Sequence, residues 1–214
     1  MKTVIFLSSF HLETGKCNWL ELYYVIEKLK PEVIFEELCN ETFEDIYFKG
    51  YTPQSLEAKA VKKYIENYTA KHFPIDTYET DFSEIFGNYS IIAEKNPEYL
   101  MLLNDKLKLI NQFGHSFINN PKCAEMLRGL RQIEKTTLLE INNTELLQRY
   151  DLERKLHDKR EIQMLHNIYD YSEHLDYRKA LFICGAEHRD EIINKIPVIQ
   201  GNKKEKLNWI FYES

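Results

Sequence analysis

Two histidines occupy matching positions near the two ends of the chain. His11 and His188 each follow a short, mainly apolar run, and each stands three residues after a small residue, Ser8 or Gly185. Imidazole is the most frequent metal ligand among side chains and is easily tuned to titrate near neutral pH. The matched spacing indicates a shared site in which the histidines are metal ligands, or in which one is a general base with an oriented partner. A structural role for both is the alternative.

Acidic side chains accompany these histidines. A third run, residues 32–35, ends in Glu36 and Glu37. Because a carboxylate beside a buried strand is costly to bury without a partner, one of the two must face the site or solvent. We expect Glu37 to face the site, as an oxygen ligand or as the partner that fixes a histidine tautomer, with Glu36 as the alternative. Glu187, next to His188, is a candidate general acid or base, unless it is a solvent-facing loop carboxylate.

The elements that carry these residues are predicted to be strands of one sheet. The runs at 3–7, 32–35 and 180–184 are rich in branched and aromatic residues, which is typical of strands buried on both faces in parallel sheets. A helical period at 19–30 joins the first two strands into a β-α-β unit. Ligands of open parallel sheets bind beyond the carboxyl ends of the strands, where both histidines and Glu37 fall.

Further elements complete an α/β fold with a mainly parallel central sheet flanked by helices. We expect a third strand at 75–81, with Asp81 at the same rim, and a final edge strand at 207–212. The aromatic segment 40–53 is predicted to be irregular and could form a lid or rim. The remaining segments are predicted helices: 55–69, 83–94, 98–113, 121–133, 145–175 and 189–195, the last ended by Pro197.

Residues 82–175 contain no convincing strand and are predicted to form a long helical insertion before the last Gly-x-x-His strand. The final helix of this insertion is long and highly charged, and Glu153 and His157 are spaced i, i+4 on it. We interpret most of this charge as a solvated helix face. On this evidence alone, Arg160 would be a surface residue.

Length and composition limit the class of protein. A chain of 214 residues with 43% hydrophobic content suits one α/β domain spanning 1–214, with the insertion inside it. A formal charge of −6 argues against nucleic-acid binding and against anionic membrane surfaces. Because neither a secretory signal nor an apolar stretch of about 18 residues is found, we expect a cytoplasmic protein.

Several common catalytic and ligand-binding motifs are not found in the sequence. Four cysteines without Cys-x-x-Cys spacing are expected to be free thiols, with a thiol nucleophile or metal thiolate as the alternative. The Gly-x-Ser-x-Gly nucleophile elbow, a phosphate-binding glycine loop and the His-Glu-x-x-His zinc motif are missing from the chain.

The order of these motifs resembles the TraB/Tiki superfamily, with its erythromycin esterase-like and haem-binding ChaN-like relatives. Those proteins carry a Gly-x-x-His after the first strand and another near the C-terminus, a Glu-Leu after the second strand, and an arginine on the helix before the last motif. The matching residues here are Gly185, His188, Glu37, Leu38 and Arg160. In the first motif Ser8 stands in place of glycine before His11. The resemblance covers roughly residues 1–81 and 150–195.

The resemblance implies a hydrolase in which water attacks the carbonyl carbon of a peptide or an ester. It also implies a pocket built from His11, Glu37, Arg160 and His188, in which Arg160 holds a substrate carboxylate or the tetrahedral oxyanion. The superfamily includes metal-dependent peptidases and metal-independent esterases. The site would therefore either hold a divalent metal on His11, Glu37 and His188 or use a histidine as general base.

Two other classes of function stay open. One is a non-catalytic protein of the same fold that binds a small ligand such as haem, on which the aromatic segment 43–51 would stack. The other is a partner-binding protein whose helical insertion forms the interface. The substrate, the metal and the formation of a homo-oligomer are not determined by the sequence.

Overall fold

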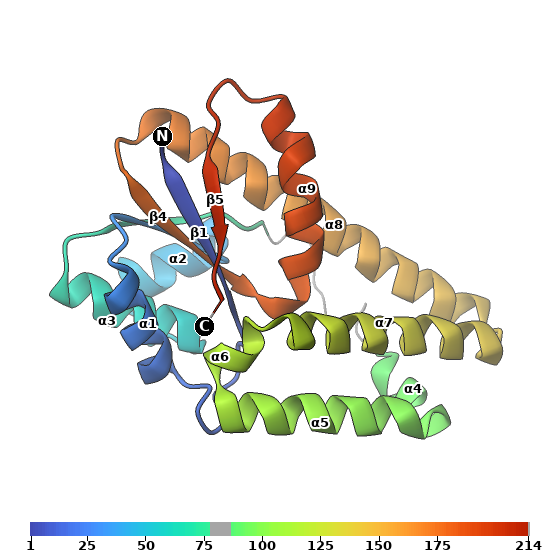
Figure 1. Cartoon of the computed structure of the whole chain (residues 1–214). Coiled ribbons are helices and arrows are strands. Elements are labelled where there is room, and N and C mark those ends of the chain that lie inside the picture. The colour runs from blue at the N-terminus through green and yellow to red at the C-terminus, as the bar shows by residue number, and fades with distance from the viewer. Residues whose placement is uncertain (78–86, 214) are drawn as a thin grey trace.

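A parallel sheet forms the centre of the molecule (Figure 1). The computed structural model describes residues 1–77 and 87–213, and within them five strands lie in the order β3-β2-β4-β1-β5, all parallel. The strands are β1 (Thr3–Ser9), β2 (Val33–Glu36), β3 (Lys71–Pro74), β4 (Lys179–Gly185) and β5 (Asn208–Phe211). The predicted α/β fold is confirmed, with β1 and β4 adjacent although they come from opposite ends of the chain.

The central strands β1 and β4 are buried on both faces. Phe6 and Phe182 are neighbours in the register, are fully buried, and stack with ring centroids 4.7 Å apart. Because helices cover both faces of the sheet, these strands are apolar throughout and do not alternate between apolar and polar residues. This burial is the reason that the apolar runs of the sequence mark the strands so clearly.

The two histidine motifs match in sequence but are offset by one position in the sheet. The register pairs Ser9, not Ser8, with Gly185. Ser8 is therefore an ordinary buried strand residue and needs no glycine-like conformation. Its backbone N–H donates to Asn119 Oδ1 at 2.8 Å, and its carbonyl accepts a 2.9 Å bond from Asn119 Nδ2. The two histidines, which lie beyond the ends of their strands, are therefore not at equivalent positions in the sheet.

Helices cover both faces of the sheet. The helices on one face are α1 (Trp19–Leu29) and α3 (Leu56–Asn67), and those on the other are α8 (Thr144–His174) and α9 (Arg189–Gly201). The side chains of Asn18 and Ser55 accept hydrogen bonds from the first turns of α1 and α3, so both helices begin at the caps that the sequence predicts. Three layers result, with an apolar core on each side of the sheet (Figure 1).

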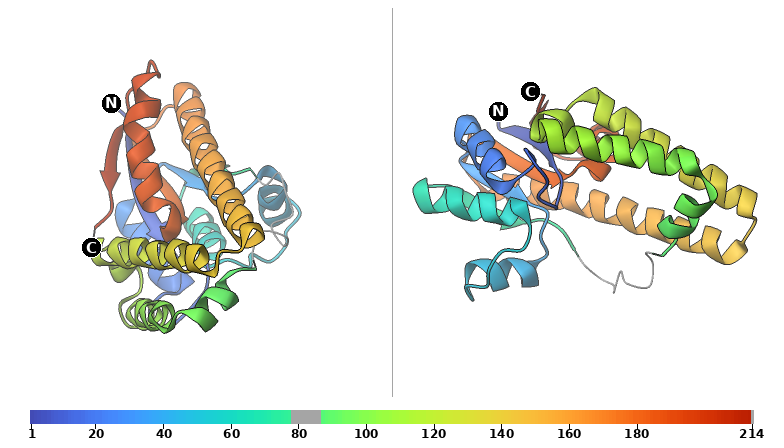
Figure 2. Two further views of the ribbon diagram at one scale, coloured as in Figure 1. Left: turned by 90° about the vertical axis from the view of Figure 1, so that its right-hand side faces the viewer. Right: turned by 90° about the horizontal axis from the view of Figure 1, so that it is seen from below.

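The helical insertion lies across the carboxyl edge of the sheet (Figure 2). Its helices before α8 are α4 (Tyr89–Lys95), α5 (Pro97–Phe113), α6 (His115–Ile118) and α7 (Pro121–Ile141). α5 and α7 pack side by side, and α6 contacts β1. The second half of α8 packs into the core through Met164, Leu165 and Ile168, so this helix joins the insertion to the sheet. Among the helices described, none combines the length and the apolar character that crossing a bilayer requires.

The third strand, β3, lies earlier than predicted. Its neighbour β2 has only four residues, and pairing between the two extends over that length. The backbone N–H groups of Ile75 and Asp76 still donate 3.0 Å bonds to carbonyls at the end of β2 and after it, but these residues are not strand. The predicted strand at 75–81 is therefore wrong at its start. Its remainder, with Asp81, lies outside the described residues.

Two helices also differ from the sequence prediction. The segment predicted to be irregular contains α2 (Asn40–Tyr47), which buries Phe43. The last helix, α9, continues through Pro197, where its end was predicted. A proline inside a helix costs about 3 kcal/mol or more. Burial of Ile196 and Ile199 against the sheet offsets this cost, because the core contact requires the helix to continue.

Candidate functional site

A pocket of about 380 Å³ lies at the carboxyl ends of β1, β2 and β4, beside the helical insertion. All five residues predicted for the site line it: His11, Glu37, Arg160, Glu187 and His188. Four of them come from the segments that follow three different strands, and Arg160 comes from α8. Because parallel strands end at a common edge, the topology brings together residues that are far apart in sequence.

Glu37 lies at the centre of this group. Its Oε1 is 3.1 Å from Arg160 Nη2 and 3.4 Å from His188 Nε2, and its Oε2 accepts a 2.6 Å bond from the Gly185 N–H. Burial acts to raise the pKa of Glu37, but the positive charges of His188, His11 and Arg160 outweigh it and hold this pKa well below its usual range. Glu37 is therefore an ionised carboxylate among cationic groups.

Arg160 is largely buried rather than a surface residue, with 12% of its side chain exposed. Its Nε donates to Asp76 Oδ1 at 3.0 Å, and its Nη2 bonds both Asp76 Oδ2 and Glu37. Asp76 follows β3 and stands at the rim position that the sequence analysis gave to Asp81. Correct placement of the third strand would have identified Asp76, since it is the first acidic residue after that strand.

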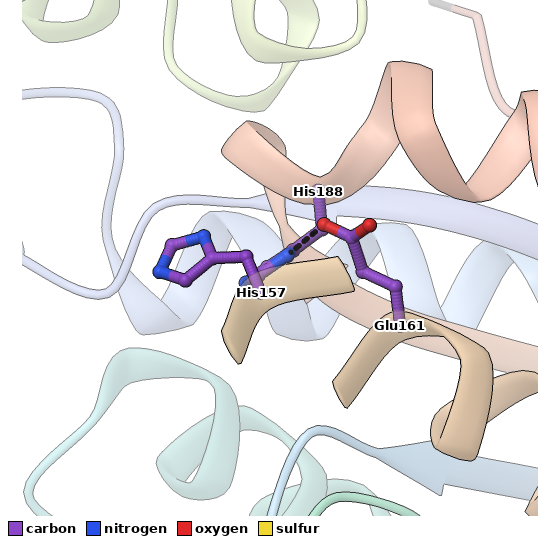
Figure 3. A group of neighbouring side chains, drawn as sticks. All are labelled: His157, Glu161 and His188. Atoms are coloured by element: carbon purple, nitrogen blue, oxygen red, sulfur yellow. Dashed lines mark hydrogen bonds and ion pairs between the residues drawn. The ribbon is translucent and has the colours of Figure 1, made fainter. Parts of the chain in front are cut away.

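A second glutamate orients His188 (Figure 3). His188 Nδ1 lies 2.7 Å from Glu161 Oε1, and Glu161 Oε2 accepts a 2.7 Å bond from Lys195 Nζ. A carboxylate at Nδ1 holds the proton there and leaves Nε2 facing Glu37. Burial acts to lower the pKa of His188, but the carboxylates of Glu37 and Glu161 outweigh it and raise this pKa to about 9.

His11 has the same arrangement, with Glu57 of α3 in place of Glu161. His11 Nδ1 lies 3.0 Å from Glu57 Oε1, which also accepts a 2.5 Å bond from the Ser9 hydroxyl. The hydrogen bond to Glu57 raises the pKa of His11 to about 9, against the effect of burial. The His11 side chain is 56% exposed and that of His188 is 6% exposed, so His11 lies at the mouth of the pocket.

Gly185 makes room for the ring of His11. Its φ of −54° is accessible to any residue, so the turn does not require glycine. A Cβ atom at this position would lie 3.0 Å from His11 Nε2 and 3.5 Å from Glu37 Oε2. The imidazole therefore packs over Gly185 through Nε2, and the Glu37 carboxylate borders the same glycine. The resulting row of side chains runs in the order Glu57, His11, Glu37, His188 and Glu161.

His157 of α8 adds a third imidazole beside His188, with ring centroids 4.9 Å apart. Burial and the charge of His188 lower the pKa of His157 to about 3, so its ring is neutral. The ligand atoms of His157, Glu161 and His188 lie within 4.8 Å of one another, which is true of no other such group in residues 1–77 and 87–213 (Figure 3). Because both Glu161 oxygens already bind His188 and Lys195, we interpret Glu161 as the support of His188 rather than as a metal ligand.

Most of the charge on α8 is exposed, as predicted, but three ionisable residues of this helix are exceptions. Glu153, His157 and Glu161 are all buried, and they follow one another at a spacing of four residues. This i, i+4, i+8 pattern places them on one face of α8, which is the signal that could have found them. Sequence reasoning missed them because a polar stripe on a charged helix normally faces water.

The remaining candidates are placed as follows. Glu36 does not line the pocket; its carboxylate is buried, accepts a 2.7 Å bond from the Tyr47 hydroxyl and lies 2.8 Å from His72 Nδ1. Glu187 is an exposed residue of the lining. All four cysteines are free thiols, as predicted. Cys123 lines the pocket, and burial raises its pKa to about 11, which keeps the thiol protonated.

The aromatic segment 43–51 contributes no residue to the lining of this pocket. Phe43 and Tyr47 instead pack on each other, with ring centroids 4.8 Å apart, and on the ring of His72. No residue of this segment is therefore in position to stack on a ligand such as haem in this pocket. The binding of haem itself stays a prediction.

No family model matches the chain, and no curated protein and no solved structure matches it. The resemblance to the TraB/Tiki superfamily therefore stays a prediction that rests on the sequence motifs.

Proposed function

We propose that the pocket is the active site of a hydrolase in which water attacks the carbonyl carbon of a peptide or an ester. The main support is the row of side chains in which two imidazoles each contact a glutamate through Nδ1, while His188 Nε2 also contacts Glu37 and His11 Nε2 lies over Gly185 near that carboxylate. Hydrolysis needs one group that takes a proton from water and another that gives a proton to the leaving group. Two histidines, each tuned by its own carboxylate, can supply both.

The two histidines are suited to different roles. Each has a pKa of about 9, so each is protonated at neutral pH. His188 is buried between Glu37 and Glu161, which suits a proton donor to the leaving group. His11 lies at the mouth and would be the base, because its neutral form becomes more abundant as pH rises. We therefore expect activity to rise with pH toward about 9 and to fall once His188 also loses its proton.

Arg160 would stabilise the tetrahedral oxyanion. Asp76 holds the guanidinium through two nitrogens, and Glu37 contacts it as well, so its position is fixed before substrate binds. A preorganised positive charge in a buried site stabilises developing negative charge without reorganisation. The same four residues, His11, Glu37, Arg160 and His188, are those that the TraB/Tiki resemblance implies.

A divalent metal is the second version of the site. His11, Glu37 and His188 would supply two imidazole nitrogens and a carboxylate, and a glutamate at each opposite ring nitrogen is the usual support of such ligands. The ligand atoms of these three residues do not all lie within 4.8 Å of one another, so metal binding would have to draw them together. When bound, the ion would supply a Lewis acid that acidifies water in the site. Because both histidines must first lose a proton, apparent metal affinity should rise with pH.

A panel of esters and peptides tests this proposal with Glu37→Gln and with Glu32→Gln as the matched control. Glutamine preserves the shape of residue 37 and can still accept the bond from Gly185, whereas Glu32 lies on the surface just before β2. We expect hydrolysis to fall by about 100-fold or more in the first variant and to be unchanged in the second. No turnover of any panel member, or full activity of Glu37→Gln, would contradict the proposal.

The same panel separates the two chemical versions. Loss of hydrolysis on chelation, with recovery on adding zinc, would support the metal-dependent version. Unchanged hydrolysis under full chelation would leave the version in which His11 is the general base.

A further inference from the structure

Part of the pocket is not used by the proposed chemistry. Beside the catalytic row the pocket has an apolar wall, formed by the loop after β1 and by α5, α6 and α7 of the insertion. The apolar residues of this wall are Phe10, Leu12, Ile110, Ile118, Cys123 and Leu127. The helices that cross the carboxyl edge of the sheet therefore form one wall of the pocket in which a substrate would lie.

One charged residue lies in this apolar wall. Lys106 of α5 precedes Ile110 by one helical turn, shares its buried face and is only 5% exposed. Lysine is almost never buried without a partner, because an ammonium that loses water needs a compensating charge. Within residues 1–77 and 87–213, however, Lys106 has neither a hydrogen bond nor an ion pair.

The ammonium of Lys106 can be reached from the pocket. The residue lines the pocket. Its Nζ is not one of the fully buried side-chain polar atoms that lack a hydrogen bond in the described residues, so it keeps some exposed surface. The acidic residues of the lining do not neutralise it, since Glu37 contacts Arg160 and His188, and Glu187 is exposed. Lys106 therefore places a positive charge within the apolar wall of the pocket.

We propose that Lys106 binds the carboxylate of an amphipathic substrate, whose apolar body contacts the wall and whose ester or peptide carbonyl lies at the catalytic row. The reaction in this statement rests on the proposed function, whereas the charge selectivity does not. A single ammonium balances one negative charge, which favours a carboxylate over a dianionic phosphate. A volume of about 380 Å³ is at the small end of the usual range of about 300–1,000 Å³, which favours a small molecule over a long peptide.

This assignment gives Arg160 and Lys106 different roles in the pocket. Arg160 is already bound by Asp76 and Glu37, which suits it to steady an oxyanion at the catalytic row. Lys106 has no such partners among the described residues and would select the substrate by its remote charge. The insertion would then supply specificity, while the sheet edge supplies the reaction.

Calorimetric binding of 4-phenylbutyrate and of its neutral amide tests the proposal without requiring turnover. The variants are Lys106→Met, which keeps the apolar stem, and Lys108→Met, an exposed lysine of the same helix as the matched control. We expect wild type and Lys108→Met to prefer the carboxylate, and Lys106→Met to bind it about 30-fold more weakly while binding the amide unchanged. The melting temperature of Lys106→Met should not fall, because an uncompensated buried charge is removed.

Several results would overturn this inference. They are equal binding of the carboxylate and the amide by wild type, no measurable binding of the carboxylate, an unchanged preference in Lys106→Met, and tighter binding of 3-phenylpropyl phosphate than of the carboxylate. Charge-selective binding with no hydrolysis in any assay would contradict only the proposed reaction. Hydrolysis of neutral esters with no preference for a carboxylate would contradict only the role of Lys106.

Discussion

Replacing Glu57 by glutamine should lower the pKa of His11 from about 9 to about 6.5 or below. Glu57 acts on His11 through the contact between Oε1 and Nδ1 at 3.0 Å and through its negative charge. Glutamine has a similar shape and can still accept the hydrogen bond, but it has no charge, so the attraction between the carboxylate and the imidazolium is lost and the hydrogen bond no longer favours the protonated ring. The perturbation therefore tests whether a glutamate behind each imidazole sets its protonation.

The magnitude follows from the groups that remain around His11. Burial acts to lower its pKa, the charge of Glu37 acts to raise it, and the charge of His188 acts to lower it. Since the strongest raising effect comes from Glu57, its loss should return the pKa to the ordinary histidine value of 6.5 or lower. The corresponding change in proton affinity is roughly 300-fold.

Proton–nitrogen correlation spectra of the imidazoles, recorded over roughly pH 5 to 10 with a chelator present, measure this pKa directly. His188 provides an internal reference, because its Nδ1 partner is Glu161. Glu66→Gln is the matched control, since Glu66 is an exposed residue of the same helix, α3. A His11 pKa that stays near 9 in Glu57→Gln, or that falls equally in Glu66→Gln, would refute the reasoning.

Two further predictions concern packing and pH. Gly185→Ala should reduce turnover about 10- to 100-fold, because the new Cβ displaces His11 Nε2 from a distance of 3.0 Å, while the melting temperature stays the same or rises slightly. Gly201→Ala is the control, because a Cβ atom at Gly201 would meet open space. A fall in the melting temperature of Gly185→Ala alongside its loss of turnover would indicate general distortion instead. Burial raises the pKa of Glu134 to about 7 from 4.5, so the folded state binds this proton more tightly and the free energy of unfolding should fall as pH rises between these values. Glu134→Gln should remove this loss, adding about 3 kcal/mol at pH 8 and almost nothing at pH 4 in chemical denaturation. Equal effects at both pH values would contradict this prediction.

The central sheet was predictable from local sequence. Runs of apolar residues mark β1, β2 and β4 because strands covered on both faces bury every side chain. Helix caps such as Asn18 and Ser55 were equally readable, since they bond to backbone groups only two or three residues away. These features depend on interactions within one segment, which is why the sequence alone indicates them.

The candidate site was predictable only in part. His11, Glu37 and His188 could be grouped because each follows a strand, and parallel strands end at one edge. Arg160 required the resemblance to a known family, because its position on a charged helix suggests a surface residue. The glutamates behind the histidines, Glu57 and Glu161, were not found at all.

The partners of these residues depend on the tertiary structure. Glu57 reaches His11 because α3 packs on one face of the sheet, and Glu161 reaches His188 because α8 packs on the other. The burial of Lys106 depends likewise on how the insertion lies across the strand ends. Local sequence shows which residues are apolar or ionisable and how they are spaced. Which ionisable groups meet depends on strand register and helix packing, and both are decided by contacts between segments that are distant along the chain.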